Sequence, residues 1–280
     1  MVRSNDAVVT PLYLDSGTRR LFSIYYAPAE HARIRRAFVY VPPFAEEMNL
    51  ARRMVALQAR ALAACGIEVL VLDLFGTGDS EGDFRDARWE LWLNDVLAAA
   101  DWMERKVGAP VGLWGLRLGG LLAAVVAANQ PSRFKRLLLW QPVIDGKSMV
   151  TQFLRIRIAA SLGSENAAET TKGLRADLAA GRSVEVAGYD LSAELAQALN
   201  DVRLDRLDLP HTLQVHWYEV GPHVRDQLSR AVERIAGAWR ERGVSVTVFG
   251  IAGDPFWSVP ESPPVAELLA ATARNANSWQ

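Results

Sequence analysis

Cysteine and histidine are both scarce in this chain of 280 residues. Cys65 is the single cysteine, which excludes an internal disulfide framework and a cysteine metal cluster, and we expect its side chain to pack as a small hydrophobe at a helix end. The sequence contains no H-E-x-x-H pattern or comparable metal-ligand spacing, and no glycine-rich nucleotide loop followed by Lys-Ser or Lys-Thr. We therefore expect neither a metal nor a cofactor.

The chain also lacks an excess of either charge and a long apolar run. It has 31 basic and 32 acidic side chains and a net charge of −1, so no broad electrostatic field favours nucleic acid. The longest apolar stretch, Leu118–Ala128, has about 11 residues, whereas roughly 20 are needed to cross a bilayer. Residues 1–14 contain no continuous apolar segment of the kind found in signal peptides. We expect a cytoplasmic protein with no membrane span and no nucleic-acid partner.

Two local patterns alternate along most of the chain. Runs rich in β-branched and aromatic residues predict strands at Leu21–Tyr26, Ala37–Val41, Glu68–Leu72, Val111–Trp114, Leu137–Trp140, Leu213–Val220 and Val244–Phe249. Helical periodicity predicts helices at Leu50–Ala64, Ala87–Lys106, Leu116–Ala127, Val224–Arg242 and Pro264–Asn275. Strands that alternate with helices predict an α/β fold with a mostly parallel central sheet and helices on both faces. We expect one such domain over residues 1–280.

This alternation is interrupted at residues 146–210. The segment is polar, contains no central-strand pattern and includes a short predicted helix at Ala193–Leu199. It lies between two predicted strands, so we interpret it as a helical insertion. Such an insertion is either a lid that closes over an active site or an elaboration that only covers apolar surface.

A glycine-flanked turn follows the predicted strand at Val111–Trp114. The sequence VGLWGLRLGG (residues 111–120) follows the G-x-S-x-G pattern of a nucleophile elbow, except that Arg117 stands at the serine position. In such an elbow the glycines admit a sharp strand-to-helix turn, and the central side chain projects at the helix N-terminus. The upstream loop PPFAEEM (residues 42–48) lies where this arrangement has its oxyanion loop, so the backbone amides of Phe44 and Ala45 are candidate oxyanion donors.

This order of motifs resembles the α/β-hydrolase superfamily over nearly the whole chain. More narrowly, the motifs PPFAEEMN, LDLFGTGDSEGDF, LWGLRLGG and GDPFW resemble the second hydrolase family associated with the exosortase A system of Gram-negative bacteria. The resemblance implies an α/β-hydrolase fold with a helical lid. It also implies a cytoplasmic, hydrolase-like protein of a locus for exopolysaccharide production and for sorting of PEP-CTERM proteins, and it specifies no substrate.

The residues expected for serine chemistry are incomplete. Acyl transfer in this fold needs a nucleophile, a histidine that takes its proton and an acid that orients the histidine. Arg117 cannot attack a carbonyl, because its guanidinium stays protonated and has no lone pair to donate. The loop after the last predicted strand contains Asp254 and no histidine, whereas Glu219 ends the preceding strand and matches the acid. Two of the three triad roles are therefore empty.

A relocated nucleophile or base is the alternative. Ser80 follows Gly78 and Asp79 in the loop after the strand at Glu68–Leu72, where such proteins share a serine without using it as the nucleophile. His223 follows the strand that ends at Val220 and is the candidate for a relocated base; the other histidines are His31, His211 and His216. A lone histidine is more often a surface or hydrogen-bonded structural residue.

Arg117 predicts a site for negative charge. Free amides and the macrodipole at a helix N-terminus already favour an anion, and the guanidinium adds to that potential. Either an internal carboxylate pairs with Arg117, from Glu46, Glu47, Asp145 or Glu219, or the guanidinium holds the carboxylate or phosphate of a ligand. Both arrangements are compatible if Glu47 releases the arginine when a ligand enters. The predicted ligand-binding residues are Phe44, Ala45, Glu46, Glu47, Arg117, Leu118 and Trp257.

Three hypotheses for function follow from these observations. In the first, the serine chemistry is lost and the protein binds or acts on an acidic small molecule or a glycan or lipid precursor. In the second, the protein is a non-catalytic scaffold or regulator that binds a partner protein. In the third, it is an enzyme with a relocated nucleophile.

Overall fold

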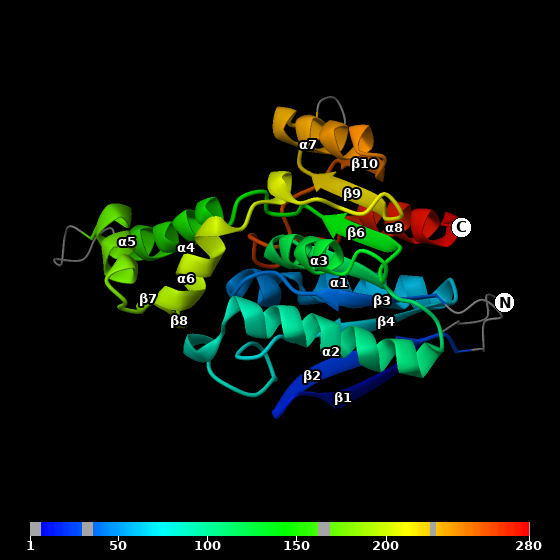
Figure 1. Cartoon of the computed structure of the whole chain (residues 1–280), viewed down its shortest axis with the longest axis horizontal. Helices are drawn as coiled ribbons and strands as arrows, with labels where there is room; N and C mark the ends of the chain where they lie inside the picture. Colours follow the sequence, from blue (N-terminus) through cyan, green and yellow to red (C-terminus); the bar gives the residue numbers. More distant parts are fainter. Residues whose placement is uncertain (1–6, 30–35, 162–168, 225–227, 280) are drawn as a thin grey trace.

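A computed structural model describes residues 7–29, 36–161, 169–224 and 228–279. Its centre is a sheet of eight strands in the order β1-β2-β4-β3-β5-β6-β9-β10, which crosses the middle of Figure 1. The strands are β1 (Val8–Ser16), β2 (Arg19–Ala27), β3 (Arg36–Val41), β4 (Ile67–Leu72), β5 (Gly112–Leu116), β6 (Arg136–Trp140), β9 (Gln214–Val220) and β10 (Ser245–Ile251). The six strands from β4 to β10 run parallel, whereas β1 and β2 pair antiparallel with their neighbours. The predicted mostly parallel sheet is confirmed.

Helices cover both faces of this sheet. One face packs on α1 (Glu46–Ala64) and α8 (Ala266–Ser278), and the other on α2 (Trp89–Val107), α3 (Leu118–Asn129) and α7 (Arg230–Glu241). Neighbouring side chains of a strand point to opposite faces, so Leu113 joins the core under α2 and α3 while Trp114 joins the core under α1 and α8. Both faces of β5 are therefore dry, and all five of its residues are buried.

The segment between β6 and β9 is mostly helical and also contains a short hairpin that was not predicted. It contains α4 (Gly146–Ser161), α5 (Thr171–Ala179), the short hairpin β7 (Val184–Val186) with β8 (Tyr189–Leu191), α6 (Ala193–Asp201) and the 3₁₀ turn η2 (Leu204–Arg206). These elements extend to the left of the sheet in Figure 1. Phe153 of α4 packs edge-to-face on Phe44, and Tyr189 packs on Phe84, so aromatic contacts tie the insertion to the core. Residues 162–168 of the predicted insertion lie outside the described residues.

Several predicted boundaries need correction. The strand β1 was not predicted, because most of its residues are exposed on both faces and give no hydrophobic pattern. The helix α1 begins at Glu46 instead of Leu50, and α7 begins at Arg230 instead of Val224, with residues 225–227 outside the described part. Cys65 does lie at a helix end, but its side chain is exposed and not packed.

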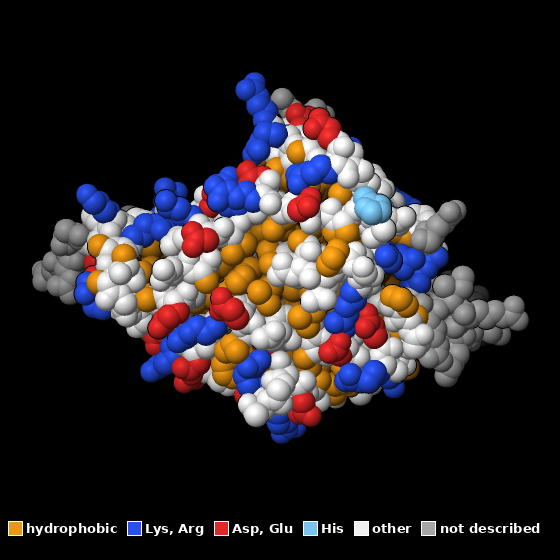
Figure 2. Space-filling view, viewed as in Figure 1, with side chains coloured by type: hydrophobic (Ala, Val, Ile, Leu, Met, Phe, Trp, Pro, Cys, Tyr) orange, Lys and Arg blue, Asp and Glu red, His pale blue; other side chains and the backbone are white. Residues whose placement is uncertain are grey.

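The surface charges are mixed in sign. On the face shown in Figure 2, acidic and basic side chains are interspersed around a central apolar area, as the net charge of −1 leads one to expect. Within the described ranges, no helix combines the length and the apolar character needed to cross a membrane.

Candidate functional site

The sharp turn between β5 and α3 has the predicted elbow geometry. Arg117 adopts φ 55° and ψ −120°, a backbone conformation that costs a non-glycine residue about 1–3 kcal/mol. The turn is held by backbone hydrogen bonds, since Arg117 N donates to Trp140 O at 3.0 Å and Arg117 O accepts from Val143 N at 3.0 Å. At Gly119 a Cβ would lie 2.2 Å from the carbonyl oxygen of Val41. Glycine is therefore required there for the helix to approach β3.

Arg117 forms an ion pair with Glu47. Its Nε donates to Glu47 Oε1 at 3.1 Å, and the two side chains are 16% and 17% exposed. Only Nε is used: the terminal nitrogens of the guanidinium make no hydrogen bond with any described residue. The guanidinium carbon lies 5.4 Å from the centre of the Trp257 ring, which is a cation–π distance. Among the four carboxylates considered from the sequence, the structure therefore places Glu47 on the arginine.

The position of Glu47 follows from a second strained turn. Ala45, the N-cap of α1, has φ 50° and ψ −126°, nearly the same conformation as Arg117. Glu46 and Glu47 then occupy the first turn of α1, where the helix dipole stabilises negative charge. Burial raises the pKa of Glu47, while the charge and hydrogen bond of Arg117 lower it. Its Oε2 is buried without a hydrogen-bond partner.

The other carboxylates have different partners. Glu46 accepts hydrogen bonds from Asn49 Nδ2 at 3.0 Å and from the Tyr189 hydroxyl at 3.1 Å, so adjacent Glu46 and Glu47 do not form a pair of acids at one centre. Asp145 forms an ion pair with Arg203 at 2.6 Å. The contact of Tyr189 with Glu46 was not predictable from the sequence, because it depends on how the insertion packs against α1.

Glu219 is buried at the end of β9, at the position expected for the acid. Its Oε1 accepts from Trp217 Nε1 at 2.8 Å and its Oε2 from Gln141 Nε2 at 3.4 Å. Burial raises the pKa of Glu219, and these two hydrogen bonds and the charge of Arg117 lower it. Gln141 was not predicted as a site residue; its Oε1 also accepts from Val220 N at 2.6 Å. The carboxylate of Glu219 is thus bound by the indole of Trp217 and the side-chain amide of Gln141.

The loop after β10 brings an indole to the site in place of an imidazole. Trp257 is buried under the guanidinium of Arg117. Asp254, in contrast, is exposed, and its backbone carbonyl accepts a hydrogen bond from Phe256 N at 2.8 Å. Trp257 thus contacts Arg117, and its role as a wall of a ligand site stays a prediction.

The structure describes three of the four histidines. His216 stacks on Trp279 with ring centres 4.0 Å apart, and burial lowers the pKa of its imidazole to about 4. His211 and His223 are exposed, and His31 lies outside the described residues. Within the part of the chain that the structure describes, no imidazole bonds to Arg117 or Glu219.

The hydroxyl of Ser80 forms hydrogen bonds with the backbone around its own loop. Its buried hydroxyl donates to Asp73 O at 2.6 Å and accepts from Phe22 N at 2.9 Å. Both contacts are to backbone, and they fix the loop after β4 against β2. The hydroxyl therefore has the partners of a structural serine.

Three of the predicted ligand-binding residues border a small hollow next to the elbow. Phe44, Ala45 and Leu118 line a hollow of about 10 Å³, which is about the space that one water occupies. Phe44 fills much of this region by packing edge-to-face on Phe84, Trp92 and Phe153. A ligand larger than a water therefore cannot enter this hollow unless one of these aromatic side chains moves.

Replacing Arg117 with alanine should destabilise the protein. Alanine keeps the backbone strain at this position but leaves the Glu47 carboxylate without its cation. We expect the free energy of unfolding to fall by about 2 kcal/mol, less than the roughly 3–5 kcal/mol for a fully buried pair, because both side chains retain some solvent contact. Urea unfolding measures this loss. Arg182→Ala, which removes an exposed pair with Asp177, is the control and should change stability by less than about 0.5 kcal/mol; equal effects for the two variants would contradict a structural role for the pair.

The deficit of Arg117→Ala should also depend on pH. A carboxyl whose folded-state pKa is raised stabilises the fold at low pH, and that stabilisation is lost as pH rises through the folded-state pKa. Removing Arg117 removes both interactions that lower the pKa of Glu47, so the pKa rises further. Unfolding curves between about pH 8 and about pH 5 should show the deficit shrinking on acidification. With Glu47→Gln in the background the pH dependence of the deficit should be smaller, because only the charge interaction of Arg117 with Glu219 remains, and a deficit that grows on acidification would exclude this explanation.

Comparison with known proteins identifies the family. Residues 34–187 match the family model described as serine aminopeptidase, S33. Over 88 residues the chain is 33% identical to the human monoglyceride lipase, a match that covers 31% of this chain and 29% of the lipase; the chain therefore matches under a third of that relative's length.

Solved structures show the same fold at low sequence identity. Est1E from Butyrivibrio proteoclasticus with bound ferulic acid superposes with a TM-score of 0.69 at 16% identity, over 95% of this chain and 97% of that one. An esterase from Pyrobaculum calidifontis gives 0.63 at 17% identity, over 97% and 85%. Together with the sheet order and the elbow, these matches show that the chain belongs to the serine aminopeptidase S33 family of α/β-hydrolases.

Proposed function

We propose that this α/β-hydrolase binds an acidic small molecule, or an acidic glycan or lipid precursor, at Arg117 and has lost the serine chemistry of its family. The observation that carries the proposal is the guanidinium in the elbow, paired with Glu47 through Nε alone. Its two terminal nitrogens are without protein partners among the described residues. They form the planar fork that suits a carboxylate or phosphate.

Exchange of one carboxylate for another would admit the ligand. The anion of the ligand takes the guanidinium while Glu47, which buries one oxygen without a hydrogen bond, takes up a proton or turns to solvent. The raised pKa of Glu47 favours the protonated form once Arg117 is engaged elsewhere. Trp257 would remain behind the guanidinium as a fixed aromatic wall.

The setting that we propose comes from the sequence motifs. The segments PPFAEEMN, LDLFGTGDSEGDF, LWGLRLGG and GDPFW support a cytoplasmic role in a bacterial exosortase and exopolysaccharide system that sorts PEP-CTERM proteins. Acidic sugars and lipid-linked phosphates of exopolysaccharide synthesis are anions of the class that Arg117 would recognise.

Anion binding provides the test. We expect inorganic phosphate and glucuronate to raise the melting temperature of the wild-type protein at low ionic strength, and glucose, which has no charge, to leave it unchanged. Arg117→Ala should lose the response to both anions, whereas Arg182→Ala should keep it. A response of equal size in Arg117→Ala would show that the anions bind elsewhere and would contradict the proposal.

A non-catalytic scaffold that binds a partner protein is the second candidate. The hollow of about 10 Å³ beside Phe44 and Leu118 favours it, because a filled site needs no ligand to be stable. In that case none of the anions would bind at Arg117, and the paired site would serve only to hold the two loops together.

Hydrolysis separates both candidates from an enzyme with a relocated nucleophile. Arg117→Ser should not hydrolyse aryl esters above the uncatalysed rate, because Trp257 lies where a base would have to stand and a serine needs that base. A panel of aryl esters of different acyl length measures this for the wild type and the variant. Turnover by the wild type that a serine-directed fluorophosphonate abolishes would contradict the loss of serine chemistry.

A further inference from the structure

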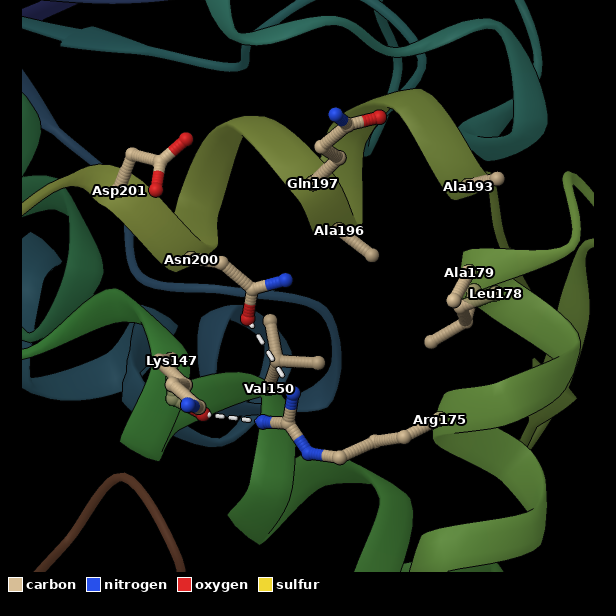
Figure 3. Close-up of a pocket in the computed structure, with 10 residues that line it drawn as sticks. All are labelled: Lys147, Val150, Arg175, Leu178, Ala179, Ala193, Ala196, Gln197, Asn200 and Asp201. Carbon is tan, nitrogen blue, oxygen red and sulfur yellow. Dashed lines mark hydrogen bonds between the residues drawn. The ribbon is translucent and has the colours of Figure 1, made fainter.

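The insertion contains a cavity of its own. It has a volume of about 440 Å³, within the roughly 300–1,000 Å³ of small-molecule sites, and it lies between α4, α5 and α6 (Figure 3). None of the residues that line it belongs to the site around Arg117. Any role for this cavity is therefore separate from the function proposed for the elbow.

Small apolar side chains leave the space open. Ala179 of α5 and Ala193 and Ala196 of α6 lie around the hollow in Figure 3, with Leu178 next to Ala179 and Val150 near the guanidinium of Arg175. Alanines at these facing positions do not fill the gap between the three helices, as leucines would. The cavity therefore offers an apolar wall to the body of a ligand.

Arg175 connects the three helices by hydrogen bonds. Its side chain crosses from α5 along one border of the hollow (Figure 3). The guanidinium donates to Lys147 O of α4 at 2.6 Å, to the Thr151 hydroxyl of α4 and to Asn200 Oδ1 of α6 at 3.2 Å. These bonds fix the spacing of the helices, so the cavity is formed before any ligand arrives.

The charge of Arg175 is not neutralised by these contacts. All three acceptors are neutral, and neither Arg175 nor Lys147 forms an ion pair with another described residue. The exposed side chain of Lys147 lies on the same side of the cavity. Asp201 is the one carboxylate among the lining residues, and it lies at the end of α6 farthest from the three alanines (Figure 3). An unpaired positive charge thus borders a hollow that has polar side chains on one part of its wall and small apolar side chains on the other.

We propose that this cavity is a second binding site, which takes a small carboxylic acid with an apolar body. The carboxylate would pair with Lys147 beside the guanidinium of Arg175, and the apolar part would lie against Ala179, Ala193 and Ala196. Removing the apolar body from water supplies affinity, and the two cations discriminate against a neutral analogue of the same shape.

Matched pairs of ligands test this proposal on the full chain. Isothermal titration calorimetry at low ionic strength compares octanoate with octanamide and benzoate with benzamide, so that each pair differs in charge alone. We expect the wild type to bind at least one of the carboxylates about tenfold more tightly than its amide. Equal affinities for acid and amide, or no binding of any of the four at millimolar concentration, would overturn the proposal.

Variants locate the site. Lys147→Gln should reduce the preference for carboxylate several-fold, while Lys172→Gln, the same change on the surface of α5 away from the cavity, should leave it unchanged. Ala179→Leu fills the hollow and keeps Arg175 in place, so it should abolish binding without unfolding the protein, which circular dichroism checks. Carboxylate binding that survives Ala179→Leu would place the site elsewhere.

Arg117→Ala separates this site from the elbow. It should retain wild-type affinity for the carboxylate if the ligand binds in the insertion. Loss of binding in Arg117→Ala, with Ala179→Leu unaffected, would assign the carboxylate to the elbow and overturn the second site. The two proposals are tested independently. Phosphate and glucuronate have no apolar body, so a failure of these anions to bind at Arg117 says nothing about octanoate or benzoate in the insertion.

Discussion

The ion pair between Arg117 and Glu47 is the interaction that joins the loops at the carboxyl ends of β3 and β5. Both side chains follow strained turns of almost identical geometry, at Ala45 and at Arg117 itself, and each turn starts a helix at the end of a parallel strand. A cation at the N-terminus of α3 opposes the dipole of that helix, whereas Glu47 in the first turn of α1 complements the dipole of its own helix. The negative charge of Glu47, which the dipole of α1 favours, therefore compensates the positive charge of Arg117, which the dipole of α3 disfavours. The ion pair also connects the two turns.

The elbow is built by the backbone, so its shape does not require a particular side chain at its centre. Gly115 and Gly119 give the strand and the helix room to approach each other, and the hydrogen bonds that shape the turn are made by the backbone N and O of Arg117. Neither requirement depends on the side chain at position 117. Function in this fold is determined by a few side chains placed on a conserved framework of strands and helices, so those side chains can change while the cores on both faces of the sheet remain.

The sequence was sufficient to predict most of this framework. Each of the seven predicted strands is present within two residues of its predicted ends. Six of them are parallel strands, and strands inside a parallel sheet are apolar on both faces and bounded by polar turns. The elbow was predictable from its glycines. The partner of Arg117 was not, since four carboxylates were compatible with the pattern and only the strained turn at Ala45 brings Glu47 to the arginine. Likewise the contacts of Gln141 with Glu219 and of Tyr189 with Glu46 join residues 78 and 143 positions apart, and no local pattern encodes them.

The coupling between Arg117 and Glu47 tests the account most directly. A double-mutant cycle with Arg117→Met, Glu47→Gln and the double variant measures their interaction free energy from urea unfolding, free of effects that either substitution has alone. We predict a favourable coupling of about 1–2 kcal/mol, within the range found for residues in contact. Additive single substitutions, with a coupling of about zero, would show that the elbow cation is not held by Glu47 and would contradict the account.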